Sequence, residues 1–327
     1  MTESRWVTLL MLLPASLLVL VLFLLPLGYS LVSAFTTKDG SLTFDNFLKS
    51  YELYSVDVFY TIFIVGVSTL LIGLFSLSIG GYITLCGNPK LVAIMRWLYR
   101  WPLFIPFIVA AQCMRTFLAK NGLMNNTLVT TGLLEPLQTV SFLDWRGIIF
   151  AFTWKQTAFA TLLITGAMAS LDQSGIHAAR NLGANRFQIL IQIITPQITS
   201  TLTVALILSC VTMMSVLSVP LIIGAGTPTM LTADMAFRIN SYGDYGVANA
   251  LGFISYALTG TFAWIYLRKG MQEGGGNPHD YFFETGQHRS GVWNNGICHL
   301  WSSAKLAFLG FCREMVFPLQ ITDQIWL

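Results

Sequence analysis

The sequence contains few charged residues. Only 10% of its 327 residues are Asp, Glu, Lys or Arg, whereas 54% are hydrophobic, and the mean hydropathy is +0.66. An average soluble domain has about 25% charged residues, so this chain lacks the polar surface that a soluble enzyme or a nucleic-acid-binding domain needs. The net charge of +3 is also too small to indicate a nucleic-acid partner. The composition therefore predicts a membrane protein.

Several chemical signatures are also absent from the sequence. The five cysteines form no CxxC pair, and neither GxxxxGK[ST] nor HExxH occurs. These absences argue against a disulfide or metal framework, a Walker A nucleotide site and a zinc-hydrolase site. The apolar segments contain no Asp, Glu or His, the groups that proton-driven carriers and intramembrane enzymes keep at bilayer depth. We therefore predict a protein that moves a solute, is not an enzyme and has no energy source of its own.

The apolar residues gather into long segments. A helix needs roughly 20 consecutive apolar residues to cross the bilayer core. The predicted spans are 6–35, 58–85, 98–117, 147–170, 198–223 and 245–267. This pattern predicts an all-α membrane protein with six transmembrane helices.

The spans define the predicted domains and their orientation. Residues 1–270 form the transmembrane domain, and residues 271–327 form an atypical C-terminal tail in which polar and aromatic residues mix without periodicity. Arg180, Arg186, Arg268 and Lys269 would lie on the same side as the N-terminus. Because Lys and Arg are enriched in cytoplasmic loops, this bias predicts a cytoplasmic N-terminus.

The loop 171–196, between the fourth and fifth spans, contains strong local signals. Asp172 is a good N-cap for a helix that ends near Leu182, and Gly183 suits the left-handed residue that follows such a helix. Asn185 can cap a second helix. Four residues would form an apolar patch, which either inserts into a groove on a partner or lies on the membrane surface: Leu171, Ile176, Ala179 and Leu182.

The same loop resembles the coupling motif of the binding-protein-dependent ABC importer permeases, commonly written EAA…G…I.LP. His177 stands where the family usually has Glu, and Asn181 replaces a common Asp. The Leu-Gly-Ala sequence around Gly183 resembles the variant found in the spermidine/putrescine–iron–phosphonate-type subfamily. The resemblance assigns the coupling role to His177, Ala178, Ala179, Asn181, Gly183, Ala184, Phe187 and Pro196.

This resemblance implies a fold, a location and partners. The fold would be the six-helix type I importer permease fold, as a multi-pass protein of the bacterial cytoplasmic (inner) membrane. The chain would pair with a second permease subunit, as a homodimer or a heterodimer, and an extracytoplasmic solute-binding protein would deliver the solute. ATPase subunits would bind ATP and Mg, so this chain itself would bind no cofactor. The alternative is an ATP-independent channel or facilitator in which the loop motif is coincidental.

Arg115 and Lys155 lie well inside the predicted spans, whereas Arg100 lies at the edge of one. Because charges inside a membrane often mark a solute pathway, both residues are candidates for attracting an anionic group. The alternative is that each side chain extends to the interface or pairs with a partner subunit. The predicted solute is small and charged, such as a phosphonate, a polyamine or iron.

Overall fold

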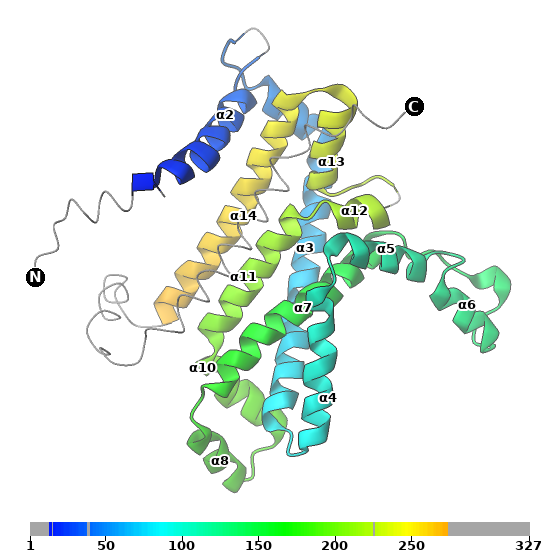
Figure 1. Cartoon of the computed structure of the whole chain (residues 1–327), viewed down its shortest axis with the longest axis vertical. Helices are drawn as coiled ribbons and strands as arrows, with labels where there is room; N and C mark the ends of the chain where they lie inside the picture. The colour runs from blue at the N-terminus through cyan, green and yellow to red at the C-terminus, as the bar shows by residue number, and fades with distance from the viewer. Residues whose placement is uncertain (1–12, 15, 38–39, 225, 274–327) are drawn as a thin grey trace, which may run out of the picture. The chain divides into compact units, whose positions relative to one another are not determined.

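The computed structural model describes residues 13–14, 16–37, 40–224 and 226–273 (Figure 1). Their regular structure is helical, apart from one isolated bridge between Thr36 and Leu42. The chain divides into two compact units, Met1–Gly270 and Met271–Leu327. The predicted tail 271–327 lies outside the described residues except for 271–273, which belong to the last helix.

Three described helices are long and apolar enough to cross a membrane. They are Ser16–Ala34, which includes a π-helical stretch Leu20–Leu24 and α2 (Leu25–Ala34), α3 (Asp45–Leu85) and α7 (Trp145–Ala169). α3 begins well before the predicted boundary at residue 58. At about 1.5 Å per residue its 41 residues exceed the roughly 30 Å of a hydrocarbon core, so part of α3 extends beyond the bilayer.

The predicted third span, 98–117, is wrong as a single helix. α4 (Pro89–Arg100) continues into a 3-10 turn (Trp101–Phe104), and α5 (Phe107–Leu118) then starts in a new direction. The segments Pro89–Phe104 and Phe107–Thr130, the second of which includes α6 (Leu123–Thr130), meet at 106°. Pro106 explains the break, because proline lacks a backbone N–H and keeps the preceding residue, Ile105, extended.

The fifth predicted span, 198–223, is divided into α11 (Thr199–Ser215) and α12 (Ser218–Ile223). Just before it, α9 (Arg186–Gln188), a π-helix (Ile189–Ile194) and α10 (Thr195–Gln197) form a segment that meets α11 at 80°. Counting each bent pair as one span gives up to five spans in the described residues. The sixth predicted segment coincides with α14 (Tyr245–Glu273), which follows α13 (Leu231–Phe237) and a π-helix (Arg238–Tyr242) and is not one of these five.

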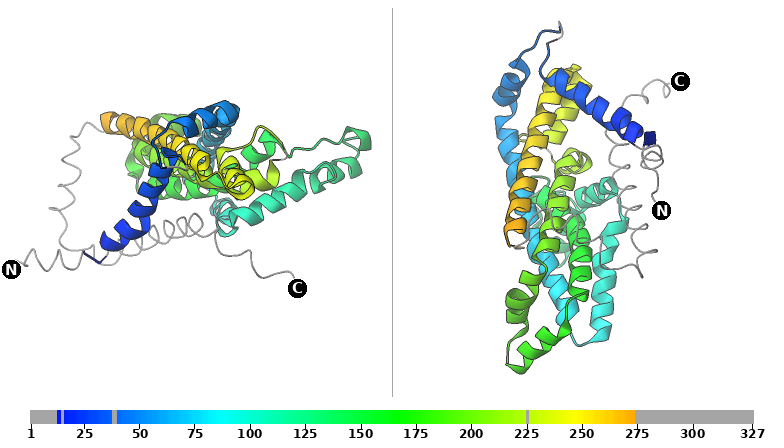
Figure 2. Two further views of the ribbon diagram at one scale, coloured as in Figure 1. Left: turned by 90° about the horizontal axis from the view of Figure 1, so that it is seen from above. Right: turned by 90° about the vertical axis from the view of Figure 1, so that its left-hand side faces the viewer.

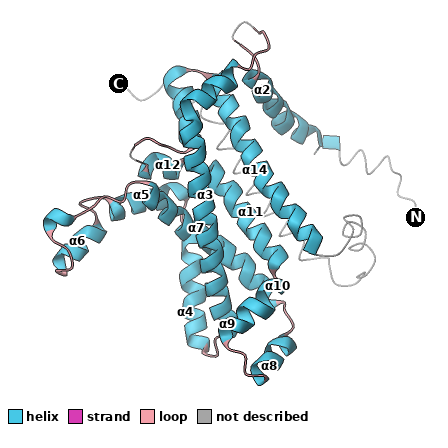
Figure 3. Cartoon of the chain, turned by 180° about the vertical axis from the view of Figure 1, so that it is seen from behind, coloured by secondary structure: helices cyan, strands magenta, loops and turns pink. Residues whose placement is uncertain are grey.

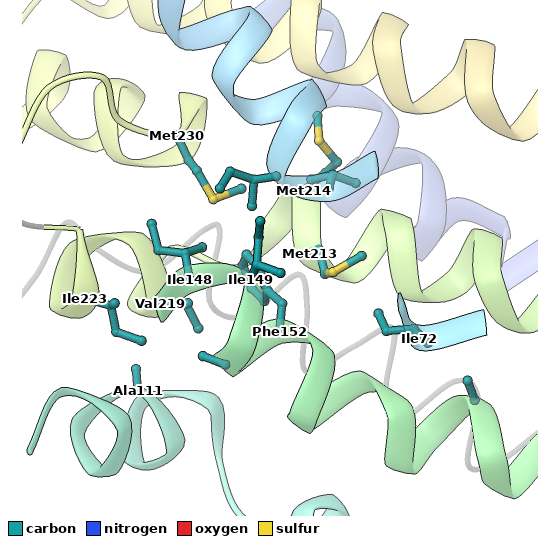
Figure 4. Packing of buried hydrophobic residues seen from close by; sticks show 14 of the residues in the cluster. Ile72, Ala111, Ile148, Ile149, Phe152, Met213, Met214, Val219, Ile223 and Met230 are labelled. Carbon is teal, nitrogen blue, oxygen red and sulfur yellow. The ribbon is translucent and has the colours of Figure 1, made fainter. Parts of the chain in front are cut away.

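The centre of the first unit is formed by α3, α7 and α11, which lie side by side (Figures 1 and 2). Ile72 of α3, Phe152 of α7 and Met213 of α11 meet there with Val219 and Ile223 of α12, and all five are fully buried (Figure 4). A second cluster joins the ends of α3 and α7 to the loop 171–196, which follows α7.

Candidate functional site

The loop begins with a capped helix, α8 (Gln173–Asn181). The Asp172 carboxylate accepts a hydrogen bond from the Ser174 backbone N–H at 2.9 Å and another from the Ser174 hydroxyl. These hydrogen bonds lower the pKa of the Asp172 carboxyl, and they satisfy one of the free N–H groups at the start of the helix. The predicted N-cap is therefore confirmed.

The turn after α8 is also as predicted. Gly183 has φ of +84°, the left-handed conformation that residues with a Cβ avoid. Its N–H donates to the carbonyl of Arg180, and the N–H of Ala184 donates to that of Ala179, both at 3.0 Å. These two bonds form a Schellman motif, which closes the carbonyl end of α8 and reverses the chain.

Asn185 starts the second helix through a reciprocal capping box with Gln188. The Asn185 side chain accepts from the Gln188 N–H at 2.8 Å, and the Gln188 side chain accepts from the Asn185 N–H at 2.9 Å. The helix widens into the π-helix Ile189–Ile194 just before Pro196. The Thr195 hydroxyl donates to the Leu190 carbonyl in this stretch at 2.8 Å.

The apolar face of α8 lies against the rest of the chain. Ile176 and Ala179 are only 2% and 8% exposed, and they pack in a cluster with Leu85 at the end of α3 and Met168 at the end of α7. The prediction that Ile176 and Ala179 form a patch for a partner or a membrane surface is therefore wrong. Leu171 is half-buried beside the same cluster.

The surface of the loop is made by other residues. Leu182 and Phe187 are 89% and 71% exposed. Ala184 is half-buried, and the remaining predicted coupling residues are exposed: His177, Ala178, Asn181, Gly183 and Pro196. α8 and its turn lie at one end of the helical bundle, the same end as the start of α4 (Figure 3).

A polar contact between α8 and α3 was not predicted. Arg180 Nη2 donates to the carbonyl oxygen of Leu85, the last residue of α3, at 3.3 Å. This carbonyl has no partner within its own helix, and a guanidinium beside a helix C-terminus is favourable. Together with the buried Ile176 and Ala179, this bond fixes α8 to the end of α3. No local pattern could have indicated it, because 95 positions separate the two residues.

Lys155, on α7, is 8% exposed, and its ammonium donates to the carbonyls of Pro102 and Leu103. These carbonyls lie at the break between α4 and α5, where a membrane would offer no water to satisfy them. Lys155 also lies 5.4 Å from the Phe107 ring centroid and lines a cavity of about 210 Å³ that includes Gln156. In the structure Lys155 thus supplies the hydrogen-bond donor for two carbonyls at the helix break.

Arg115 is placed differently. It is exposed near the C-terminal end of α5, and its side chain has no hydrogen-bond or ion-pair partner among the described residues. Neither Arg115 nor any other residue of its turn lines the cavity beside Lys155. The structure therefore does not bring the two predicted cations into one cavity.

Two solved structures resemble this arrangement of helices. One is a bacterial ABC transporter involved in the import of the acidic polysaccharide alginate, with a TM-score of 0.67, 22% identity and coverage of 82% of this chain and 96% of that one. The other is the bacterial alginate ABC transporter in complex with an alginate pentasaccharide-bound periplasmic protein, with a TM-score of 0.66, 20% identity and coverage of 80% and 92%. The chain has the type I ABC importer permease fold.

Curated proteins similar in sequence to this chain include transport permeases. The trehalose/maltose transport system permease protein MalF of Thermococcus litoralis is 28% identical over 189 residues, which cover 54% of this chain and 62% of MalF. The spermidine/putrescine transport system permease protein PotB of Haemophilus influenzae is 25% identical over 181 residues, covering 53% and 62%. The chain thus spans less than two thirds of these relatives. No protein-family model matches the sequence.

These relatives support the ABC permease family but not the predicted subfamily. Their names include sugar and polyamine transport systems, so they do not single out the spermidine/putrescine–iron–phosphonate type. The Leu-Gly-Ala variant around Gly183 is too short to carry that distinction. The names of these relatives therefore do not identify the solute of this chain.

A pair of substitutions separates the two cations. We expect Lys155→Met to lower the amount of folded protein, because it leaves two carbonyls at the helix break without a donor. Leaving a buried polar group unsatisfied costs roughly 1–3 kcal/mol of stability. Arg115→Gln should leave that amount unchanged, since the side chain is exposed. Detergent-solubilised yield and thermal unfolding measure both effects. Equal stability of Lys155→Met and the wild type would contradict the role given to Lys155.

Proposed function

We propose that this chain is the membrane-spanning permease subunit of an ATP-driven, binding-protein-dependent importer. In this proposal it forms the solute pathway, and the loop 171–196 couples the pathway to a separate ATPase subunit. The type I importer permease fold and the relatives named permease proteins support the proposal.

The observation that carries the proposal is the way α8 is attached. Its inner face is fixed to the ends of α3 and α7 by Ile176 and Ala179, and Arg180 adds a hydrogen bond to α3. Its outer surface presents Leu182 and Phe187, two exposed apolar side chains next to the Gly183 turn. A partner that moves α8 would therefore displace the ends of two membrane-spanning helices.

The proposed partners follow from this role. ATPase subunits would dock on the exposed side of α8 and would bind ATP and Mg. A second permease subunit, identical or different, would complete the pathway, and an extracytoplasmic solute-binding protein would deliver the solute at the opposite end. The proposed location is the bacterial cytoplasmic (inner) membrane.

We propose that the transported solute is a small charged molecule. Arg115 is the residue that supports it, because its guanidinium is exposed and has no partner among the described residues. Arg115→Gln should then lower uptake of an anionic solute without lowering the amount of assembled complex. Unchanged uptake would remove the support for a charged solute and would leave the permease role untouched.

Reconstitution tests the function itself. The chain is co-expressed with the ATPase, the second permease and the binding protein from the same genome, and the purified complex is placed in proteoliposomes. We expect the ATPase to co-purify with the chain and uptake to require ATP and the binding protein. Solute flux through the chain alone, without ATP, would favour the facilitator instead.

Thiol labelling tests the orientation. In a variant whose five natural cysteines are serine, we expect a membrane-impermeant maleimide to label Asp45→Cys in intact cells and to label Leu182→Cys only after the cells are opened. Both positions are exposed in the structure, and Asp45 lies at the opposite end of α3 from α8. The reverse pattern would place the N-terminus and α8 outside the cell.

A further inference from the structure

A second feature at the α8 end of the bundle is an open cleft of about 390 Å³ between α3, α4 and α7. Its polar lining consists of two guanidinium groups, three hydroxyls and one amide, from Arg96, Arg100, Tyr99, Thr84, Thr165 and Gln173. No acidic side chain contributes to this lining in the described part of the chain. The size lies within the range of about 300–1,000 Å³ typical of small-molecule sites.

The positive charges of the two arginines in the cleft are not neutralised by an acidic side chain among the described residues. Arg96 and Arg100 are four residues apart on α4, which places them on one face of the helix, where like charges repel each other. Neither forms an ion pair with a described residue. Arg100 Nε instead donates to the hydroxyl of the buried Tyr99 at 3.4 Å. An anion bound between the guanidinium groups would remove this repulsion.

The cleft lies where membrane-spanning helices end. Thr84 is the second-last residue of α3, and Ala169, which also lines the cleft, is the last residue of α7. Trp97 and Trp101 on α4 are 57% and 55% exposed, with ring centroids 4.6 Å apart. Exposed tryptophans next to basic residues are typical of the headgroup level of a bilayer.

We propose that this cleft binds the phosphate-bearing headgroup of an anionic phospholipid. The guanidinium groups of Arg96 and Arg100 hold the phosphate. The hydroxyls of Thr84 and Thr165 donate to the carbonyls of Gly80 and Thr161 in their own helices, so towards the headgroup they act as acceptors. Leu162, which lines the cleft and is 40% exposed, is available to the acyl chains. Gln173 begins α8, so the lipid lies against the proposed coupling helix. The inference depends on the membrane fold and not on the partner ATPase.

The test measures which lipid the full-length chain retains. The chain is reconstituted in nanodiscs of phosphatidylcholine with a minor fraction of phosphatidylglycerol, extracted in mild detergent, and its bound lipids are quantified by mass spectrometry. We expect the wild type to retain more phosphatidylglycerol, relative to phosphatidylcholine, than the nanodiscs contain. Arg96→Gln and Arg100→Gln should each reduce this enrichment about fivefold. Arg96→Lys and Arg100→Lys should keep most of it, because they keep the charge.

Lys90→Gln is the matched control. Lys90 lies on the same helix and carries the same charge but does not line the cleft, so its loss should leave the enrichment unchanged. Equal losses in Lys90→Gln and the arginine variants would reduce the effect to general surface charge and overturn the site. Full enrichment in both arginine variants would also overturn it.

Inorganic phosphate distinguishes a lipid from a soluble anion. We expect phosphate at the ionic strength of a chloride control to leave the bound phosphatidylglycerol in place. If phosphate, but not chloride, displaces the lipid, then a soluble phosphate compound is the ligand and the lipid assignment fails. Because ATPase subunits are absent from this assay, its outcome is independent of the proposed transport function.

Discussion

A Gly183→Val variant is expected to reach the membrane and to lose both ATP-driven uptake and solute-stimulated ATP hydrolysis. Gly183 has φ of +84°, and a residue with a Cβ in this region costs roughly 1–2 kcal/mol. That cost alone lowers the population of the native turn by about fivefold to thirtyfold. The Schellman bonds to Ala179 and Arg180 are then lost, and α8 no longer presents Leu182 and Phe187 in the same direction.

The reason for this expectation is conformational and not steric. A Cβ on Gly183 would meet nothing within 4 Å, so the surrounding atoms would accept the larger side chain. Gly175→Ala is the matched control, because Gly175 lies in α8, has the same open surroundings and has no positive φ. It should retain full uptake. Normal uptake in Gly183→Val, at wild-type protein levels, would separate the turn from coupling and favour the facilitator.

The local features of this loop could be predicted because nearby residues determine them. Asp172 bonds to Ser174, Asn185 bonds to Gln188, and Gly183 closes a helix of nine residues. Each of these interactions joins positions at most five apart in the chain. The choice of a capping side chain or a glycine is therefore visible in a short stretch of sequence.

The breaks in the membrane helices were harder to predict. Pro102 and Pro106 are visible in the sequence, but prolines also occur in continuous transmembrane helices. The structure breaks the helix at Ile105, and Lys155 from α7 compensates for the break by binding the carbonyls of Pro102 and Leu103. Lys155 follows these carbonyls by 53 and 52 positions. The local sequence therefore could not show that the carbonyls freed by the break have a hydrogen-bond donor.

The direction of the apolar face of α8 was predicted wrongly for a related reason. The pattern of Ile176 and Ala179 correctly shows that one face of the helix is apolar. It does not show what covers that face, since many exposed side chains of this bundle are apolar too. The covering residues are Leu85 and Met168, at the ends of α3 and α7. Their position depends on the packing of the whole bundle.

The second large effect is expected from two neighbouring alanines with opposite environments. Ala179 is buried in the cluster that holds α8, whereas Ala178 is exposed. Ala179→Asp places a carboxylate among apolar side chains, at a cost of several kcal/mol. We expect this variant to release α8 from α3 and α7 even in the isolated chain. Ala178→Asp should leave α8 in place and weaken only the contact with the ATPase.

Hydrogen exchange on the purified chain, without partners, separates these two effects. Amides of residues 173–182 should exchange at least about tenfold faster in Ala179→Asp than in the wild type, because local unfolding then exposes the helix. The same amides should be unaffected in Ala178→Asp. In the assembled transporter both variants should lose uptake, with ATPase co-purification reduced in each. Unchanged exchange in Ala179→Asp would mean that the buried cluster does not hold α8, and the coupling proposal would then lack the attachment through which a partner's motion reaches α3 and α7.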